Sequence, residues 1–148
     1  MQLFKTLWAN HPSNKGKTAP CKDAKGDSAF PNQCAIRLGL ALRASGVNFA
    51  SFKGARCWFG HTGHILRVEE LAAWLKTQKH EVGTAVSFQP GSDASSRVTG
   101  QTGILAIRNF YGAGNQGDHI DLWDGTRMAQ GSADYMDTAE EVIFWNLA

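Results

Sequence analysis

Two side chains able to cut an amide bond stand far apart in this chain of 148 residues. Cys34 opens an apolar run that ends at residue 44, and His119 opens a short alternating segment. A thiolate can attack a carbonyl carbon once a base has taken its proton, and imidazole is the most common such base. The sequence therefore predicts acyl transfer by a cysteine–histidine pair, provided that the fold brings the two residues together.

Cys34 stands at the head of a predicted helix over residues 34–44, which reads CAIRLGLALRA and is apolar nearly all round. Asn32 is a good N-cap and would make Cys34 the second helical residue. A thiol there lies near the positive end of the helix dipole, which favours the thiolate. The free N–H groups of the first turn could also hold an oxyanion. The alternative is a buried cysteine that only fills the core.

His119 begins a predicted strand over residues 119–123, which reads HIDLW. Side chains alternate between the two faces of a strand. If Ile120 and Leu122 face the core, His119 lies on the opposite face. The alternative is an ordinary exposed hairpin that has no catalytic role.

The turn after this strand determines which side chain can orient the imidazole. Asp124-Gly125 is a strong signal for a two-residue type I′ hairpin turn. With that turn, His119 lies directly opposite Gln130, whose amide could select the tautomer of the ring. Asp121, two residues further along the same face, is the alternative orienting group.

The remaining patterns predict one domain with an α+β fold, helices first and then an antiparallel sheet. No linker divides residues 1–148, and the length suits a single core. We expect helices over 3–9 and 67–80, strands over 84–88, 103–110 and 140–147, and polar or glycine-rich loops over 10–32, 89–101 and 111–118.

The composition excludes several classes of protein. Hydrophobic residues make up 43% and charged residues 19%, which argues against a disordered tail or a coiled coil. The net charge of +2 argues against a nucleic-acid binder, which needs a basic face. No apolar stretch is long enough for insertion into a membrane, and the N-terminus does not resemble a Sec signal peptide.

A zinc site is a competing interpretation. Cys57, His61 and His64 form a Cys-x3-His-x2-His pattern that could supply three ligands. No second compact Cys/His pair completes the set, so we expect no metal and no cofactor. A non-catalytic cell-wall-binding module and a cytosolic thiol enzyme of another kind also remain open.

Several segments resemble one known family in order and in content. They read NQCAIRLGLAL (32–42), HILRVEELAAWL (64–75), TGILAI (102–107) and GDHIDLWDG (117–125), followed by EEVIFWNLA at the C-terminus. The most specific parts are the Cys-x-x-Arg helix and the His-x-x-Leu-Trp-x-Gly hairpin. Together they resemble the type VI secretion amidase effectors of family four, which are papain-like peptidases related to the NlpC/P60 peptidoglycan hydrolases.

The resemblance implies an antibacterial cysteine peptidase. A type VI secretion apparatus would deliver it, without a Sec signal peptide, to act in the periplasm of a rival cell. There it would cut the γ-D-glutamyl–meso-diaminopimelate bond of peptidoglycan stem peptides. A cognate immunity protein is the implied partner, and we expect it to insert a loop into the groove at Cys34.

The resemblance also assigns residues. Cys34 would be the nucleophile and His119 the general base. The third member in this family is typically an aspartate after the turn, where this sequence has Gln130. Related NlpC/P60 enzymes accept a polar amide or an imidazole there, and Asp121 and Asp134 are carboxylates that could substitute.

Three further residues have expected roles. Arg37, one turn after Cys34, either pairs with a substrate carboxylate or holds a neighbouring loop. If Cys34 stays free, Cys21 and Cys57 are the natural disulfide pair, as suits a protein of the periplasm.

Overall fold

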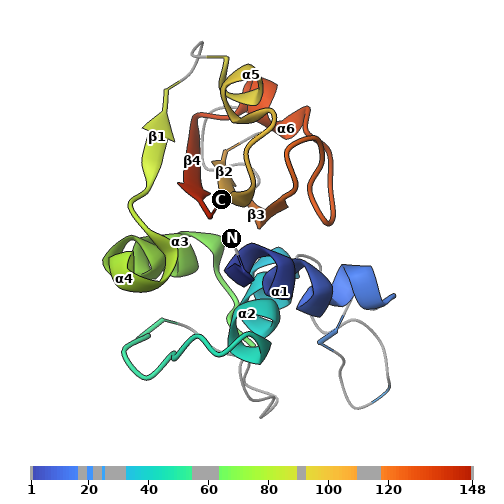
Figure 1. Ribbon diagram of the computed structural model, residues 1–148, viewed down its shortest axis with the longest axis vertical. Coiled ribbons are helices and arrows are strands. Elements are labelled where there is room, and N and C mark those ends of the chain that lie inside the picture. The colour runs from blue at the N-terminus through green and yellow to red at the C-terminus, as the bar shows by residue number, and fades with distance from the viewer. Residues whose placement is uncertain are drawn as a thin grey trace.

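The computed structural model describes residues 2–16, 20–21, 25, 33–54, 64–89, 93–109 and 118–147. Its centre is a four-stranded sheet in the order β1-β4-β2-β3, with every neighbouring pair antiparallel (Figure 1). The strands are β1 (Val86–Phe88), β2 (Gly103–Arg108), β3 (His119–Trp123) and β4 (Glu141–Asn146). The prediction of an α+β fold with an antiparallel sheet is confirmed.

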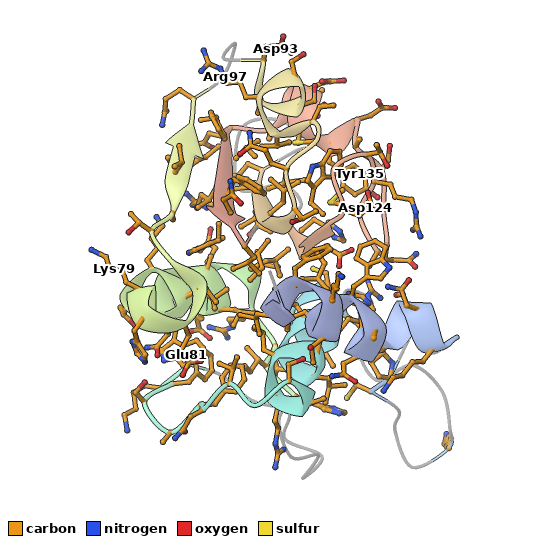
Figure 2. All side chains as sticks on the ribbon, viewed as in Figure 1. Lys79, Glu81, Asp93, Arg97, Asp124 and Tyr135 are labelled. Atoms are coloured by element: carbon orange, nitrogen blue, oxygen red, sulfur yellow. The ribbon has the colours of Figure 1, made fainter. Side chains whose placement is uncertain are left out.

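Helices lie on both sides of this sheet. The helices are α1 (Gln2–Asn10), α2 (Cys34–Ala44), α3 (Val68–Thr77), α4 (Lys79–Val82), α5 (Ala94–Val98) and α6 (Tyr135–Thr138), with a 3-10 helix, η1 (Pro12–Lys15). Helices α1 to α4 lie towards one side, and α5 and α6 lie towards the other (Figure 1). The charged side chains of Lys79, Asp93 and Arg97 are exposed at the periphery (Figure 2).

Strand β2 separates two hydrophobic cores because alternate side chains point to opposite faces. Ile104 and Ala106 pack with α1, α2 and α3. Leu105 and Ile107 pack with α5 and α6. All four residues are fully buried, so both faces of the sheet are covered at this strand.

This second core corrects the predicted environment of β3. Ile120 and Leu122 face the α2 side as expected, but Trp123 packs into the opposite core. His119 and Asp121 are 6% and 1% exposed. The polar face of the strand is therefore buried, and its polar groups need partners inside the protein.

Some element boundaries were predicted correctly. Helix α2 spans residues 34–44 and strand β3 spans residues 119–123, as the patterns indicate. The predicted helix over 67–80 is wrong as a single piece, because Gln78 leaves the helical conformation at φ −97 and ψ 48. The predicted loop over 89–101 contains α5.

The predicted loop over 10–32 also begins with regular structure. Pro12 lies in the first turn of η1, where its missing N–H costs nothing, and Gly16 ends the helix at φ 76. Most residues from 17 to 32 lie outside the described part of the chain, as does the glycine-rich segment 111–117. Among the described residues, no helix has both the length and the apolar character that a membrane span requires.

The two-residue hairpin turn is wrong. Oδ1 of Asp124 accepts hydrogen bonds from the main-chain N–H groups of Thr126 and Arg127, at 2.9 and 2.8 Å. This Asx-type turn is longer, and Trp123 pairs with Met128 instead of Thr126. The longer turn shifts the register by two residues, which places Gln130 opposite Asp121 and not opposite His119.

Gly103 is the tightest point of the sheet. A Cβ at this position would lie 1.9 Å from the main-chain oxygen of Trp145. A clash with backbone cannot be relieved by a side-chain rotation, so we expect Gly103→Ala to lower the free energy of unfolding by about 3 kcal/mol or more. Urea denaturation measures this loss.

Gly46→Ala is the matched control. Gly46 has φ +93 and open space around its missing Cβ. Its replacement costs only the left-handed conformation, about 1 kcal/mol. Equal losses in the two variants would contradict the close approach of β2 and β4.

Candidate active site

The site forms where the head of α2 meets the beginning of β3. Cys34 is 1% exposed, and its Sγ lies 3.7 Å from the main-chain oxygen of Asp118. Asp118 directly precedes His119, and Cys34 lies close enough to His119 to raise the pKa of its imidazole. The structure therefore brings together the two residues that the sequence singles out.

The predicted capping of α2 needs correction. Cys34 is the first helical residue, not the second, and Gln33 is the N-cap, while Asn32 lies outside the described residues. The side-chain amide of Gln33 does not cap the helix, because it forms hydrogen bonds with the main chain of Cys21 instead. Its Oε1 accepts from the N–H of Cys21 and its Nε2 donates to the carbonyl of Cys21, both at 2.8 Å. These two hydrogen bonds tie Cys21 to the head of α2.

His119 is held by acceptors on one side of its ring. Its Nε2 lies 2.7 Å from the main-chain oxygen of Gln130 and 3.4 Å from Oδ2 of Asp121. Since both neighbours are acceptors, Nε2 carries a hydrogen. Nδ1 is then the nitrogen available to exchange a proton with Cys34. The ring of Tyr135 packs edge-on against the imidazole at 5.5 Å between centroids.

The electrostatics of the site favour a charged imidazole. Burial lowers the pKa of His119, but hydrogen bonds to Asp121 and Cys34 and the charges of both residues raise it. The outcome is a pKa of about 9. His119 is therefore protonated at neutral pH and lies ready to donate.

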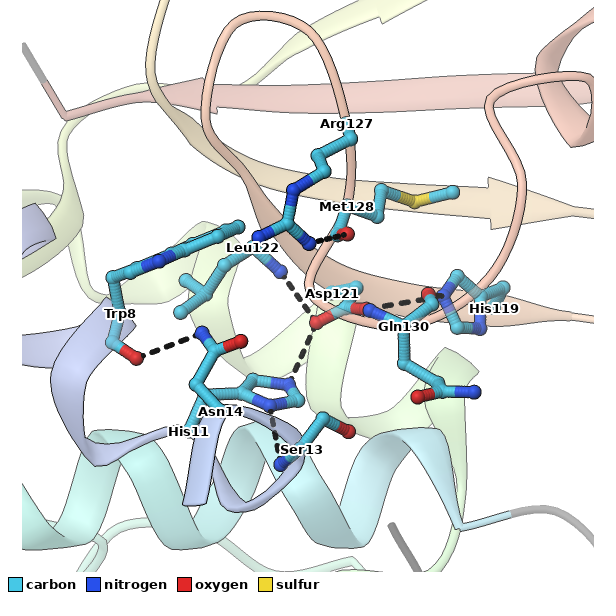
Figure 3. Close-up of polar contacts among 10 residues, drawn as sticks. All are labelled: Trp8, His11, Ser13, Asn14, His119, Asp121, Leu122, Arg127, Met128 and Gln130. Atoms are coloured by element: carbon cyan, nitrogen blue, oxygen red, sulfur yellow. Dashed lines mark hydrogen bonds and ion pairs between the residues drawn. The ribbon is translucent and has the colours of Figure 1, made fainter. Parts of the chain in front are cut away.

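Asp121 is buried and has a donor at each position that its carboxylate offers (Figure 3). Oδ1 lies 2.7 Å from Nε2 of His11 and accepts from the N–H of Leu122 at 2.8 Å. Oδ2 accepts from the N–H of Gln130 at 2.7 Å and faces His119. Burial opposes the charge, but the contacts with His11 and His119 and the charge of His119 lower the pKa of Asp121 to about 2.

The predicted role of the Gln130 side chain is wrong in its atoms. Gln130 contacts His119 through its main-chain oxygen and Asp121 through its main-chain N–H. Its half-buried amide points away from the imidazole (Figure 3). The side chain beside the ring belongs to Asp121, which the sequence analysis gives as the alternative. Asp134 is exposed and precedes α6.

Gly131 lets the chain pass this close to the ring. It has φ +101, a conformation that side chains disfavour. A Cβ there would lie 3.1 Å from Nε2 of His119 and 2.9 Å from the ring of Tyr135. The main-chain oxygen of Gln130 can reach the imidazole because no side chain follows it.

His11 is the site residue that the sequence analysis missed. It is fully buried between α1 and η1 and contacts Asp121 across 110 positions of the chain. The one local signal is its place directly before Pro12, where its side chain caps η1 by accepting from the N–H of Ser13 at 3.2 Å. Nothing in that pattern indicates the carboxylate.

Of the other residues with a predicted role, the structure describes Arg37 and Cys21 but not Cys57. Arg37 is half-buried on α2, one turn after Cys34. Cys21 is buried beside Ile36, but Cys57 lies outside the described residues, so their disulfide stays a prediction.

The zinc pattern cannot be assembled from the described residues. His64 is buried, whereas Cys57 and His61 fall outside the described ranges. Within those ranges, no group of three or more His, Cys, Asp or Glu side chains is arranged to hold a metal ion.

Comparison with known proteins points to one family. The model of the type VI secretion system amidase effector protein 4 family, Tae4, matches residues 30–145. No curated protein matches the chain.

Several solved structures share the fold over nearly the whole length. Tae4 in the Tae4-Tai4 effector-immunity complex from Enterobacter cloacae is 19% identical, with a TM-score of 0.72 and 98% of each chain covered. Tae4 from Salmonella typhimurium in complex with the immunity protein Tai4 from Enterobacter cloacae is 20% identical, with a TM-score of 0.69 and 98% of each chain covered. Tae4 from Enterobacter cloacae alone is 20% identical, with a TM-score of 0.64 and coverage of 98% of this chain and 96% of that chain.

The two candidates for the residue that orients His119 can be separated by titration. Asp121→Asn removes the neighbouring charge, so we expect the pKa of His119 to fall by about one pH unit or more. Gln130→Ala keeps the main-chain oxygen, so the pKa should stay within about 0.3 of the wild-type value. NMR of the ring carbon-bound protons against pH gives both values.

Circular dichroism of the two variants serves as the control for folding. An equal fall of the pKa in both variants would contradict the assignment of the orienting group to Asp121.

Proposed function

Because the chain belongs to the type VI secretion amidase effectors of family four, we propose that it cuts peptidoglycan stem peptides with Cys34 as nucleophile. The bond is the γ-D-glutamyl–meso-diaminopimelate amide that the family resemblance implies. The observation that supports this proposal most is that the head of α2 meets the start of β3. There Sγ of Cys34 lies 3.7 Å from the main-chain oxygen of Asp118, and the next residue, His119, faces the buried carboxylate of Asp121.

The first step transfers the acyl group to sulfur. The thiolate of Cys34 attacks the carbonyl carbon of the γ-glutamyl group and pushes charge onto the oxygen. The first intrahelical bond of α2 runs from the N–H of Arg37 to the oxygen of Gln33. N–H groups that precede this bond have no acceptor within the helix and can bind the oxyanion.

The remaining steps need a proton donor and then a base. Protonated His119 gives its Nδ1 proton to the leaving amine of diaminopimelate as the C–N bond breaks, leaving a thioester on Cys34. Neutral His119 then takes a proton from water, which attacks the thioester and releases the glutamyl carboxylic acid. Asp121 holds the ring and stabilises its charged form in both half-reactions.

Three features of the wider family complete the proposal. The fold is a papain-like domain of the NlpC/P60 type that occupies residues 1–148. The type VI apparatus delivers the protein, and the enzyme acts in the periplasm of the target cell. No cofactor takes part, since cysteine and histidine suffice for the reaction.

Arg37 and the remaining cysteines fit this setting. Arg37 lies one turn after Cys34 and pairs with a carboxylate of the stem peptide. The proposed disulfide between Cys21 and Cys57 suits an oxidising compartment. Its formation would hold the same residue, Cys21, that the Gln33 amide already ties to α2.

Digestion of purified peptidoglycan tests the reaction. We expect the rate of hydrolysis to fall by more than about a thousandfold in Cys34→Ala and in His119→Ala, because each substitution removes a reacting group. Asp121→Asn should lose about a hundredfold, and Gln130→Ala should stay within about threefold of the wild type. Mass spectrometry of the products identifies the bond by a new free D-glutamate carboxyl group and a new diaminopimelate amine.

The Gln130→Ala variant is also the matched control, since it alters a side chain beside the site without touching a reacting atom. Full hydrolysis by folded Cys34→Ala would contradict the proposed mechanism. Products that arise from cleavage of another bond would contradict the proposed substrate.

We also propose that a cognate immunity protein covers the head of α2 and blocks Cys34. Solved relatives were crystallised with an immunity protein, Tai4, from the same organism in one case and from another organism in a second. Iodoacetamide labelling of Cys34, followed by peptide mass mapping, should slow by more than about tenfold in the complex, because a bound loop excludes the reagent. An unchanged labelling rate in a stable complex would contradict occlusion.

A further inference from the structure

The N-terminal segment enters the site through a residue that lies outside the part matched by the family model. That match begins at residue 30, whereas His11 lies between α1 and η1. His11 is fully buried, and its imidazole stands beside the carboxylate of Asp121 (Figure 3). A buried imidazole in contact with a buried carboxylate needs an explanation beyond filling the core.

The hydrogen bonds of His11 fix the position of its ring proton. Nδ1 accepts a hydrogen bond from the N–H of Ser13 at 3.2 Å, so this nitrogen carries no hydrogen. The ring hydrogen is therefore on Nε2, which lies 2.7 Å from Oδ1 of Asp121. The contact is a close ion pair, but within the described part of the chain Nε2 has no acceptor in hydrogen-bond geometry, so its hydrogen is not aligned with Oδ1. The imidazole and the carboxylate are adjacent and both are buried.

The position of His11 is fixed by packing and by polar contacts on both sides. Leu7 of α1 is fully buried in the core that α1 shares with α2. Asn10 donates to Oγ of Ser45 at 3.1 Å, which ties the end of α1 to the end of α2. Asn14 donates to the main-chain oxygen of Trp8 at 3.0 Å, which ties η1 back to α1.

We propose that His11 is a positioning residue for the hydrolysis, acting through Asp121 on His119. It holds Oδ1 of the carboxylate so that Oδ2 faces the imidazole of His119. The inference rests on the proposed function and deepens it, because it extends the site into the N-terminal helices.

The physical basis is the supply of donors to a buried charge. Without His11, Oδ1 of Asp121 keeps only the N–H of Leu122. A buried carboxylate that loses a donor is less stable in its charged form, so its pKa rises. The titratable groups that act on Asp121 are His11 and His119, from the α1–η1 junction and from β3. Removing one of them leaves the other as the sole partner of this kind.

Two substitutions separate contact with Asp121 from capping of η1. His11→Asn can still accept from the N–H of Ser13, since asparagine is a good N-cap, but its amide is too short to reach Asp121. His11→Gln places a donor near the position of Nε2 and restores the contact. The pair therefore differs in the contact that the proposal invokes.

Hydrolysis of a soluble muropeptide by the full-length protein gives the kinetic readout. For His11→Asn we expect kcat to fall by about tenfold with KM within about twofold, and the acidic limb of the pH profile to move to higher pH. For His11→Gln we expect kcat within about threefold of the wild type and an unmoved acidic limb. A folded His11→Asn variant with the kcat and acidic limb of the wild type would overturn the inference.

A measurement on the wild type covers the case in which His11→Asn does not fold. Nitrogen-15 NMR of the imidazoles, without substrate, should show His11 as the Nε2–H tautomer at neutral pH. The Nδ1–H tautomer would overturn the inference, because it has no hydrogen to offer Asp121. Failure of the wild type to hydrolyse muropeptides would instead overturn the proposed function, so the two failures are distinguishable.

Discussion

A single negative charge inside the protein determines how the rest of the site is built. The carboxylate of Asp121 is 1% exposed, and an uncompensated charge in such a place costs several kcal/mol. The cost is offset by two main-chain N–H groups and two imidazoles. These donors come from the α1–η1 junction, from β3 and from the segment after the Asp124 turn. The fold must bring all three segments together to keep the charge buried.

The charge of Asp121 then acts on the proposed chemistry through one residue, His119. Asp121 keeps the imidazole of His119 protonated and oriented, and His119 in turn contacts the thiol at the head of α2. Helix α2 is apolar nearly all round and packs against β3. This packing fixes the positions of Cys34 and His119 relative to each other. A line of four side chains, from His11 to Cys34, thus joins the first helix to the proposed nucleophile.

The sequence was sufficient for the elements with a strong local pattern. The apolar run from Cys34 and the alternation of β3 depend on neighbours in the chain, and both were predicted with correct boundaries. The Gln130 side chain was misassigned because the turn depended on one side chain. Asp124 bonds two main-chain N–H groups, and this longer turn moves every later pairing by two residues.

His11 was missed for a different physical reason. Its partner is 110 positions away, and a histidine in a polar loop carries no periodic signal. The burial of His119 and Asp121 does not follow from the alternation of β3, because alternation assigns a side chain to a face of the strand but does not say what covers that face. Here the second face of the sheet is covered by α5, α6 and the turn segment, and the polar side chains are paired with one another.

The account depends most on Asp121 being ionised within the folded protein. The carboxyl carbon-13 shift of Asp121, followed from neutral pH downwards on the folded wild type, measures this directly. We predict a shift that stays at the value of the ionised form until the pH approaches about 2. A carboxyl group that titrates at or above its ordinary pKa of 3.8 would contradict the buried charge and the site built on it.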